Sequence, residues 1–273
     1  MFANKPRGRR IFSLIIGLAL LSSACATAPY TGRRQLMLTS EGHENTLGYQ
    51  AFSQIRQQHK VSQDPKLNEL VNRVGRRIAE AANRPDYRWE FVVFEDDTPN
   101  AFCLPGGKVG IYTGILKYTQ DEPGLAVVIS HEVAHALVRH AGERMSQSMM
   151  AQVGSLGLGI AMAGQNPYAA QAAQQIYGLG ATVGVLLPYS RKQESEADEV
   201  GLILMAKAGY DPEAAVGFWQ RMVAESKGRP KPPAFFSTHP TDQRRIQDIE
   251  RMLPKIKEKY YRPQEQQGRG GSR

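Results

Sequence analysis

Two histidines four residues apart, with a glutamate between them, stand near the middle of the chain in the segment HEVAH, residues 131–135. Residues four apart lie on one face of a helix, so His131 and His135 can bind one metal ion through their ring nitrogens. Glu132 is rotated by about 100° from His131, which leaves it free to take a proton from water beside the metal. Zinc suits this set, because it accepts imidazole and carboxylate ligands and keeps one position open for water. The motif therefore predicts a metal-binding helix and one zinc ion per chain.

A third protein ligand has to come from another segment. His140 follows His131 by nine residues, which on a continuous helix turns it to the opposite face, so we expect His140 to point away. In the segment RKQESEAD, Glu194 and Asp198 are four apart and share a helical face, whereas Glu196 is rotated off it. One of the two carboxylates can bind the metal while the other orients a ligating histidine. Charged residues on a helix are also common on solvated faces, and spacing alone leaves that alternative open.

The N-terminus has the organisation of an export signal. Basic residues precede an apolar run at residues 11–21, and small residues follow it. The run is about half as long as a membrane-spanning helix requires. The segment LSSACATA resembles the acylation site of bacterial lipoproteins, so we expect a signal peptide over residues 1–24 and a lipid anchor at Cys25. Ordinary cleavage after Ala26 or Ala28 is the alternative.

The formal net charge of +8 is concentrated at the two ends of the chain. Residues 1–24 carry four basic side chains, and residues 254–273 carry six basic and two acidic ones. The region between them is neutral, which argues against a nucleic-acid-binding core. We expect residues 25–39 to be a linker and residues 254–273 to be a disordered tail, with weak attraction to anionic lipid as the alternative for the tail. With Cys25 acylated, Cys103 has no partner for an intramolecular disulfide.

The remaining chain predicts one mainly helical α+β domain over residues 40–253. Two β-rich segments, residues 87–96 and 108–116, predict a small sheet, and the segment NAFCLPGG between them predicts a turn. The HEVAH helix is expected to start at the N-cap Asp121 and to continue without a break to Gly142.

The segment from Met145 to Ser190 contains no charged residue. Its apolar pieces are too short to span a bilayer. We expect helices that pack on the core, and a hairpin that dips into a membrane is the alternative.

HExxH followed at a distance by ExxAD resembles the zinc metallopeptidase family that includes the heat-shock protease HtpX and the CAAX prenyl endopeptidases. The segments NAFCLPGGKVGIYTGIL, HEVAH, ESEADEVGL and STHPTDQRRI resemble, in this order, the family's strand–turn segment, zinc helix, third-ligand helix and late His-Pro segment. The resemblance covers roughly residues 40–252 and implies a zincin-like core. It is closest in kind to the soluble, exported branch, whose lipoprotein or periplasmic members degrade damaged or misassembled envelope proteins.

The resemblance implies roles for five of the residues introduced above. It assigns His131, His135 and Glu194 as zinc ligands and Asp198 as the carboxylate that supports them. Glu132 would act first as general base and then as proton donor to the leaving amine.

The same resemblance places two late residues and one strand at the site. His239 would lie near the metal, either donating to the tetrahedral oxyanion or closing the site as a further ligand, and Arg245 would assist it. The segment Val109, Gly110, Ile111 and Tyr112 would be an edge strand that faces the cleft and binds substrate in extended form through backbone hydrogen bonds.

These expectations lead to a zinc-dependent endopeptidase at the periplasmic face of a bacterial membrane. Its partners would be unfolded or misassembled proteins, the membrane through Cys25, and, as a further candidate, the outer-membrane assembly machinery. Ala26 directly after the acylated cysteine resembles the signal for outer-membrane sorting. Two other functions stay open: a chaperone-like assembly factor with the protease fold and little proteolysis, and a zinc enzyme acting on a non-peptide amide.

Overall fold

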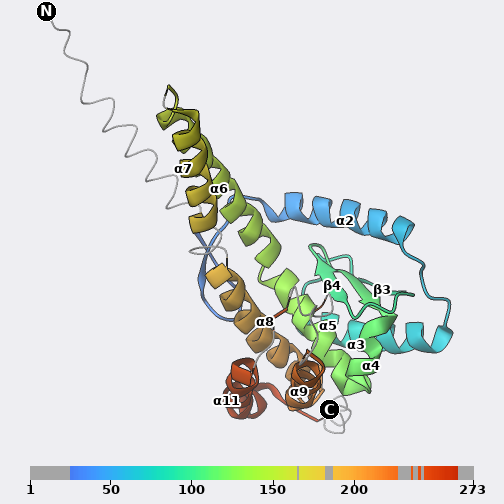
Figure 1. The fold of residues 1–273 in the computed structure, drawn as a ribbon. Helices are drawn as coiled ribbons and strands as arrows, with labels where there is room; N and C mark the ends of the chain where they lie inside the picture. The colour runs from blue at the N-terminus through green and yellow to red at the C-terminus, as the bar shows by residue number, and fades with distance from the viewer. Residues whose placement is uncertain are drawn as a thin grey trace, which may run out of the picture.

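The computed structural model describes residues 25–164, 166–181, 187–226, 235, 239–240 and 243–263. The expected signal peptide and residues 264–273 of the expected tail lie outside the described residues. The helices are α2 (Glu41–Gln58), α3 (Pro65–Ala82), α4 (Thr113–Thr119), α5 (Glu122–Leu137), α6 (His140–Ala161), α7 (Pro167–Ala181), α8 (Leu187–Lys207), α9 (Ala214–Ser226) and α11 (Gln243–Tyr260) (Figure 1). The strands are β1 (Cys25–Thr27), β2 (Arg34–Leu36), β3 (Glu90–Phe94), β4 (Ala101–Leu104) and β5 (Lys108–Tyr112). This architecture confirms a mainly helical α+β fold with a zincin-like core.

The central element is α5, the helix that carries HEVAH. Every residue from Gly124 to Leu137 is buried, because α3, α4, α8, α9 and the sheet surround it (Figure 1). Its N-terminus is capped by Asp121, whose carboxylate accepts a hydrogen bond from the backbone N–H of Gly124 at 2.7 Å, as the sequence predicts. The helix α8 packs tightly against it at Gly201, where an added Cβ would lie 3.2 Å from the backbone nitrogen of His131.

The three-stranded sheet has the order β3-β5-β4, with β3 parallel and β4 antiparallel to β5. The expectation that residues 109–112 form an edge strand is therefore wrong, because β5 lies in the middle. The edge next to α5 is β4, which occupies part of the segment expected to be a turn. Gly106 and Gly107 adopt φ angles of 84° and 86°, which L-residues with side chains rarely adopt. They reverse the chain within a tight turn, so that Ala101–Leu104 can pair as a strand with β5.

The expected single helix over HEVAH and beyond is broken into α5 and α6. Arg139 adopts the left-handed conformation with φ 60°, and α6 starts anew at His140. The guanidinium of Arg139 bonds the Glu44 carboxylate at 2.7 and 3.1 Å and the backbone carbonyl of Thr39 at 3.0 Å. These long-range contacts hold a backbone conformation that an arginine seldom adopts alone.

The two ends of the described chain are more ordered than the sequence predicts. In the expected linker, β1 pairs antiparallel with β2, with Cys25 opposite Leu36. In the expected tail, α11 continues through Pro254 to Tyr260. Leu253 and Ile256 are buried on either side of the proline, and their packing offsets the backbone hydrogen bond that proline cannot donate.

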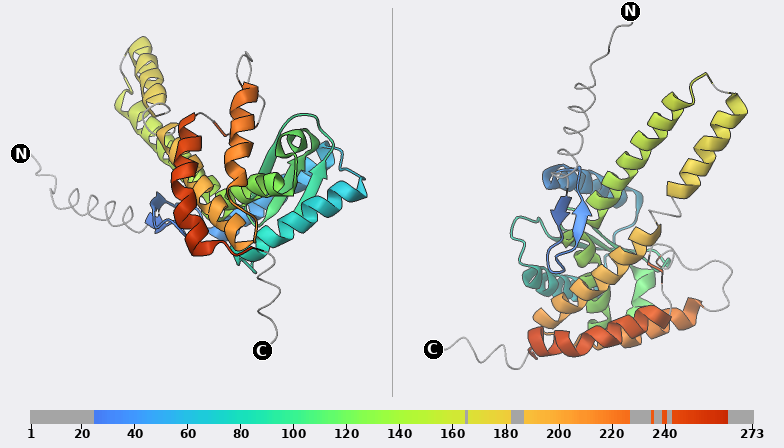
Figure 2. Two further views of the ribbon diagram at one scale, coloured as in Figure 1. Left: turned by 90° about the horizontal axis from the view of Figure 1, so that it is seen from below. Right: turned by 90° about the vertical axis from the view of Figure 1, so that its left-hand side faces the viewer.

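The helices α6 and α7 form a hairpin that extends away from the body of the molecule (Figures 1 and 2). The expectation that this region packs on the core is wrong for most of its described part. The helix α7 packs mainly on α6, and α6, which contacts α5, α2 and β2, has buried residues only between His140 and Gln147. None of the helices in the described ranges combines the length and the apolar character needed to cross a membrane.

Candidate active site

Four buried side chains from three regions of the chain meet beside α5. They are His131 and His135 of α5, Glu194 of α8, and His239, which precedes α11. The Nε2 atom of His131 lies 3.1 Å from Nε2 of His135 and 3.1 Å from Nδ1 of His239. The Glu194 carboxylate lies 2.9 Å from His239, 3.3 Å from His131 and 3.4 Å from His135. The structure thus brings together the three expected ligands and His239, which the resemblance places near the metal as an oxyanion donor or a further ligand.

This donor set fits a tetrahedral zinc ion. With zinc–nitrogen bonds of about 2.0–2.1 Å, the ligand atoms of a regular tetrahedron are about 3.4 Å apart, close to the separations seen here. Oε1 of Glu194 is buried without a hydrogen-bond partner, a costly arrangement for a carboxylate oxygen unless a cation faces it. Burial raises the pKa of Glu194, but the close His131, His135 and His239 rings outweigh that effect and lower the pKa well below its ordinary value. The ligand is therefore held ionised.

Glu132 lies at the same site without being part of the donor set. Its Oε1 atom is 3.2 Å from Nε2 of His239 and is buried with no hydrogen-bond partner. Burial raises the pKa of Glu132, although the neighbouring His239 and His131 partly oppose the shift. A carboxylate with a raised pKa is suited to accept a proton and return it near neutral pH.

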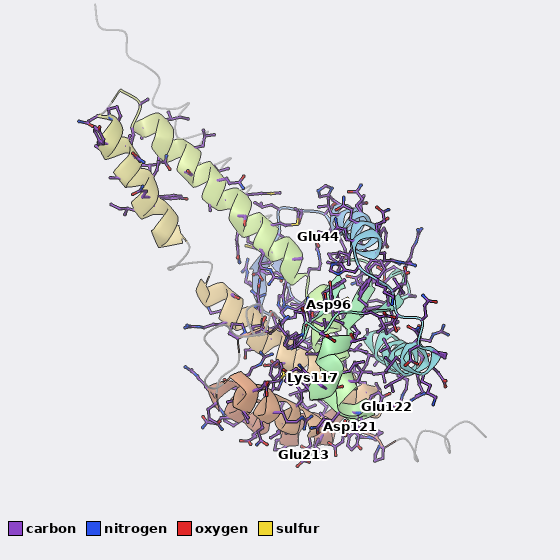
Figure 3. All side chains as sticks on the ribbon, turned by 45° about the vertical axis from the view of Figure 1, so that its right-hand side comes forward. Glu44, Asp96, Lys117, Asp121, Glu122 and Glu213 are labelled. Atoms are coloured by element: carbon purple, nitrogen blue, oxygen red, sulfur yellow. The ribbon has the colours of Figure 1, made fainter. Side chains whose placement is uncertain are left out.

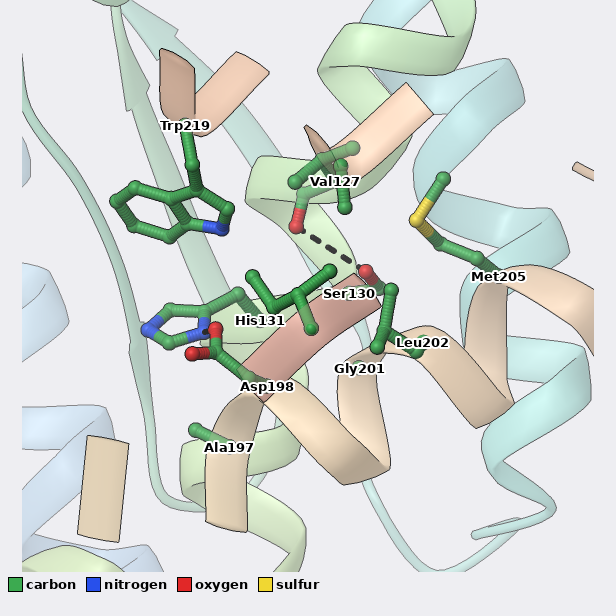
Figure 4. Close-up of a pocket in the computed structure, with 11 residues that line it drawn as sticks. Val127, Ser130, His131, Ala197, Asp198, Gly201, Leu202, Met205 and Trp219 are labelled. Carbon is green, nitrogen blue, oxygen red and sulfur yellow. Dashed lines mark hydrogen bonds and ion pairs between the residues drawn. The ribbon is translucent and has the colours of Figure 1, made fainter. Parts of the chain in front are cut away.

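The far side of the His131 ring is fixed by α8, α9 and α11. Asp198 lies 3.1 Å from Nδ1 of His131, and Arg245 bonds both carboxylate oxygens of Asp198 at 2.7 Å. The guanidinium of Arg245 stacks 3.4 Å above the centre of the Trp219 ring. Figure 4 shows Trp219 and Asp198 on either side of the imidazole, within a small cavity lined by apolar side chains. Arg245 therefore acts on the site by positioning Asp198, although its Nη1 is also 3.4 Å from Glu194.

The far side of the His135 ring is fixed by a residue that the sequence placed elsewhere. His140 does not point away: its Nδ1 lies 2.8 Å from Nδ1 of His135, and its Nε2 lies 3.0 Å from Glu196. The break at Arg139 rotates His140 back toward the site. When Nε2 of His135 binds a metal, its Nδ1 must carry the proton and donate to His140. The Nε2–H of His140 then donates to Glu196, so a single set of tautomers satisfies the whole chain of bonds.

This chain of bonds reaches the N-terminal segment. Glu196 accepts a hydrogen bond from Nε of Arg33 at 2.6 Å and another from Thr31. Arg33 also bonds both oxygens of the buried Glu143 at 2.7 Å, and Gln193 donates to Glu143 at 2.7 Å. Sequence reasoning missed Thr31 and Arg33, because their partners Glu196 and Glu143 lie more than a hundred positions away and no local pattern indicates the contact.

Replacing His140 tests this support. The change His140→Ala removes the acceptor for Nδ1–H of His135, so we expect zinc affinity to fall by about 10- to 100-fold, as for loss of an outer partner of a metal ligand. The variant His140→Asn keeps an acceptor oxygen and should recover part of the loss. His43→Ala, at an exposed histidine of α2, is the matched control. Competition with a chromophoric chelator measures all three, and equal affinities in the His140 and His43 variants would contradict the role.

The residues expected to bind substrate occupy the centre of the sheet. Val109 and Ile111 are fully buried, and both backbone edges of β5 are paired with other strands. The strand β4 pairs with β5 on one side, and no strand of the described chain pairs with its other side. The backbone of Pro99, just before β4, accepts a hydrogen bond from Phe235, whose ring contacts His239. Among the described residues, the sheet edge near the site that no strand covers therefore belongs to β4.

Comparison with known proteins identifies the family. Residues 65–253 match peptidase family M48. The chain is 34% identical to the mitochondrial metalloendopeptidase OMA1 of Schizosaccharomyces pombe over 94% of this chain and 77% of that protein. It is 29% identical to the β-barrel assembly-enhancing protease of Escherichia coli over 81% of this chain and 35% identical to a putative one of Vibrio cholerae over 71%. It spans 46% and 40% of those two bacterial proteins.

These matches confirm the expected resemblance at the level of a metallopeptidase family. The relatives named above are of the OMA1 and β-barrel assembly-enhancing types, so they support the metallopeptidase family without singling out HtpX or the CAAX endopeptidases. The chain therefore belongs to peptidase family M48 and is a metalloendopeptidase.

Proposed function

We propose that this chain is a zinc-dependent endopeptidase that hydrolyses peptide bonds of misfolded or misassembled envelope proteins. The observation that supports this most strongly is the buried group of His131, His135, Glu194 and His239 with Glu132 beside it. Three of these donors would serve as the permanent zinc ligands, and the fourth position would be shared between His239 and water. Zinc bound there would polarise the scissile carbonyl and lower the pKa of water to about 7.

The chain's own residues would carry the proton transfers. Glu132 takes a proton from the attacking water and later delivers it to the leaving amine. Asp198 and His140 hold the two histidine rings in the orientation that ligation needs. Burial of the whole group excludes bulk water and so strengthens each electrostatic interaction inside it.

We propose that substrate binds along the free edge of β4 in extended form. Backbone hydrogen bonds to an edge strand give affinity with little sequence preference. Folded proteins have their backbone groups already paired, whereas unfolded chains can offer them. This geometry supports a preference for unfolded or misassembled proteins. It assigns substrate binding to β4 instead of the expected strand β5.

His239 is proposed to close the site in the resting enzyme. Its Nδ1 lies among the ligand atoms and its Nε2 faces Glu132, so it fills the space that water and substrate need. If the open state is about one tenth of molecules, His239→Ala should raise the rate of cleavage about tenfold. Initial rates on casein at saturating zinc measure this. A fall of about 100-fold would instead make His239 an oxyanion donor, and an unchanged rate with unchanged zinc affinity would exclude both roles.

We propose that the enzyme works at the periplasmic face of a bacterial outer membrane, attached through a lipid on Cys25. The signal-like N-terminus supports this location, and so does the similarity to bacterial β-barrel assembly-enhancing proteases. That similarity also makes the outer-membrane assembly machinery a candidate partner. The OMA1 relatives are mitochondrial by name. The proposed periplasmic location therefore depends mainly on the signal-like N-terminal sequence of this chain. Mass spectrometry of the mature N-terminus tests it: an unmodified N-terminus at Thr27 or Pro29 would contradict the anchor.

The proposed activity is tested by comparing a folded globular protein with its reduced, denatured form as substrates of the full chain. We expect cleavage of casein and of the denatured form only, loss of cleavage with a zinc chelator, and recovery with added zinc. Binding of the denatured form without any cleavage would instead identify a chaperone-like factor. Cleavage that survives complete removal of metal would contradict the zinc mechanism.

A further inference from the structure

The hairpin of α6 and α7 exposes an apolar stripe to solvent. Most of the strongly exposed large apolar side chains in the described part of the chain lie on these two helices. On α6, Met149, Val153, Leu156 and Ile160 are 40, 64, 67 and 69% exposed. Their spacing of four, three and four residues places them on one face of the helix. On α7, Tyr168 and Ile176 are 83 and 71% exposed.

Beyond the base of α6, which holds Glu143 and Arg144, the hairpin carries no charge, and its exposed polar side chains, such as Gln152 and Gln171, are neutral. Residues 145–190 contain no Asp, Glu, Lys, Arg or His, although 22% of the chain is charged. Figure 3 shows the labelled charged residues on the body of the molecule, with α6 and α7 projecting beyond them. A surface that binds a protein partner has an apolar centre and a polar rim. A helix that uses one face for such a partner keeps its other faces in water, where charged residues are common. Absence of charge all round a projecting element is what surrounding hydrocarbon requires, since a buried charge there is strongly unfavourable.

The polar groups between the two helices are satisfied within the hairpin. Ser155 donates to the side-chain oxygen of Gln174 at 2.8 Å, and Gln174 donates back to the Ser155 carbonyl at 3.0 Å. The hydroxyl of Tyr177 donates to the Ala151 carbonyl at 3.1 Å, and Gly154 leaves the space for that ring. Helices joined by small residues and internal polar bonds are typical of packing inside a bilayer, where water cannot satisfy them.

We propose that the α6–α7 hairpin inserts into one leaflet of the membrane to which the protein is attached. The exposed part of α6, from Met149 to Ala161, is about 18 Å long, close to the half-thickness of about 15 Å of a bilayer's hydrocarbon core. The occupant of the stripe is thus the acyl-chain layer rather than another protein.

The position of the N-terminal strands supports the same orientation. Cys25, the expected lipid attachment site, directly follows the expected signal peptide and is the first residue of β1. β1 pairs with β2, and the segment around β2 is bonded to the base of α6: Arg33 to Glu143 at 2.7 Å and the backbone N–H of Leu38 to Ser146 at 2.8 Å. A lipid on Cys25 and the hairpin would therefore attach the protein from neighbouring points, giving the two contacts that stable membrane association requires.

Quenching of tryptophan fluorescence by brominated lipid tests the insertion. The full chain carrying Ile160→Trp is mixed with vesicles of phosphatidylethanolamine and phosphatidylglycerol, with and without dibrominated acyl chains. We expect brominated vesicles to lower the added fluorescence at least about twofold, because quenching requires contact with the acyl chains. Leu47→Trp, at an exposed leucine of α2 on the body, is the matched control and should show no quenching. The native Trp219 is buried and sets the background together with Trp89.

A second change separates hairpin insertion from attachment by the N-terminal segment. Leu156→Asp added to Ile160→Trp places a charge in the middle of the stripe and should abolish the quenching, while the lipid on Cys25 still keeps the protein on the vesicles. Quenching at position 160 no greater than at position 47 would overturn the proposal. So would quenching at 160 that Leu156→Asp leaves unchanged.

Discussion

The change Glu132→Gln is expected to abolish peptide cleavage while leaving zinc binding and the fold intact. Glutamine has nearly the same shape but cannot take a proton from water, and general-base catalysis contributes about 100- to 10,000-fold. The four donor atoms of the metal group belong to other residues, so the metal content should not change. Initial rates on casein, with metal analysis of the same sample, measure both quantities.

The same substitution has a consequence for stability that serves as its control. Oε1 of Glu132 is buried without a hydrogen-bond partner, and a neutral amide is less costly to bury than a carboxylate. The Glu132→Gln protein should therefore be at least as stable to heat as the unmodified chain. Retained turnover would exclude Glu132 as the base, and a lowered melting temperature would show that the lost activity has a structural cause.

Glu194→Ala is expected to remove zinc from the protein and to eliminate cleavage with it. The Glu194 carboxylate contacts all three histidines of the group, so its loss removes one ligand and unbalances the orientation of the others. We expect the zinc dissociation constant to rise by more than the about 10- to 100-fold that loss of an outer partner costs. The measurement is competition with a chelator of known affinity, with cleavage followed in parallel.

The control for this variant has to avoid the bonds that support His135. Glu196 is unsuitable, because it accepts the hydrogen bond of His140, and its removal should itself weaken zinc binding. Glu199 lies on the same helix, is only half-buried and is not one of the clustered donors. Glu199→Ala should bind zinc as the unmodified chain does. Equal zinc loss at positions 194 and 199 would show that the helix, rather than one carboxylate, had been damaged.

The part of the site that repeats at helical spacing could be predicted from the sequence. His131 and His135 share a face because α5 is a regular helix with a side-chain cap at Asp121. Glu194 and Asp198 share a face of α8 for the same reason, and the structure turns that face toward α5. His239 followed only from resemblance, because its place depends on a chain segment without regular spacing.

The outer partner of His135 could not be predicted, because the position of His140 depends on one residue that breaks the helical pattern. Nothing local at Arg139 signals a left-handed conformation, which Gly or Asn would have suggested. The conformation is held by Glu44 from α2, about a hundred positions earlier. Without that break His140 would point away from the site. The prediction for His140 is wrong because a tertiary contact overrides the local preference for a continuous helix.

The edge of the sheet and the hairpin show two further limits of pattern reading. The strand Ala101–Leu104 is only four residues long and is followed directly by Pro-Gly-Gly, so its sequence resembles a turn until its partner β5 is placed. Pattern reading therefore overlooks β4 and assigns the sheet edge to β5. The apolar spacing of residues 145–190 is the same whether the apolar face meets a core or lipid. Only the fold shows that most of that face meets neither α5 nor the sheet.

Zinc titration of the metal-free full chain tests the central claim most directly, namely that one metal ion held by His131, His135 and Glu194 beside Glu132 hydrolyses peptide bonds. Cleavage of casein should be absent without metal, should rise in proportion to added zinc, and should reach its plateau at one zinc per chain. In the same titration, the Glu132→Gln variant should bind one zinc ion per chain but should not cleave casein. Cleavage by metal-free protein, or full zinc loading of the unmodified chain with no cleavage of any unfolded substrate, would contradict the account.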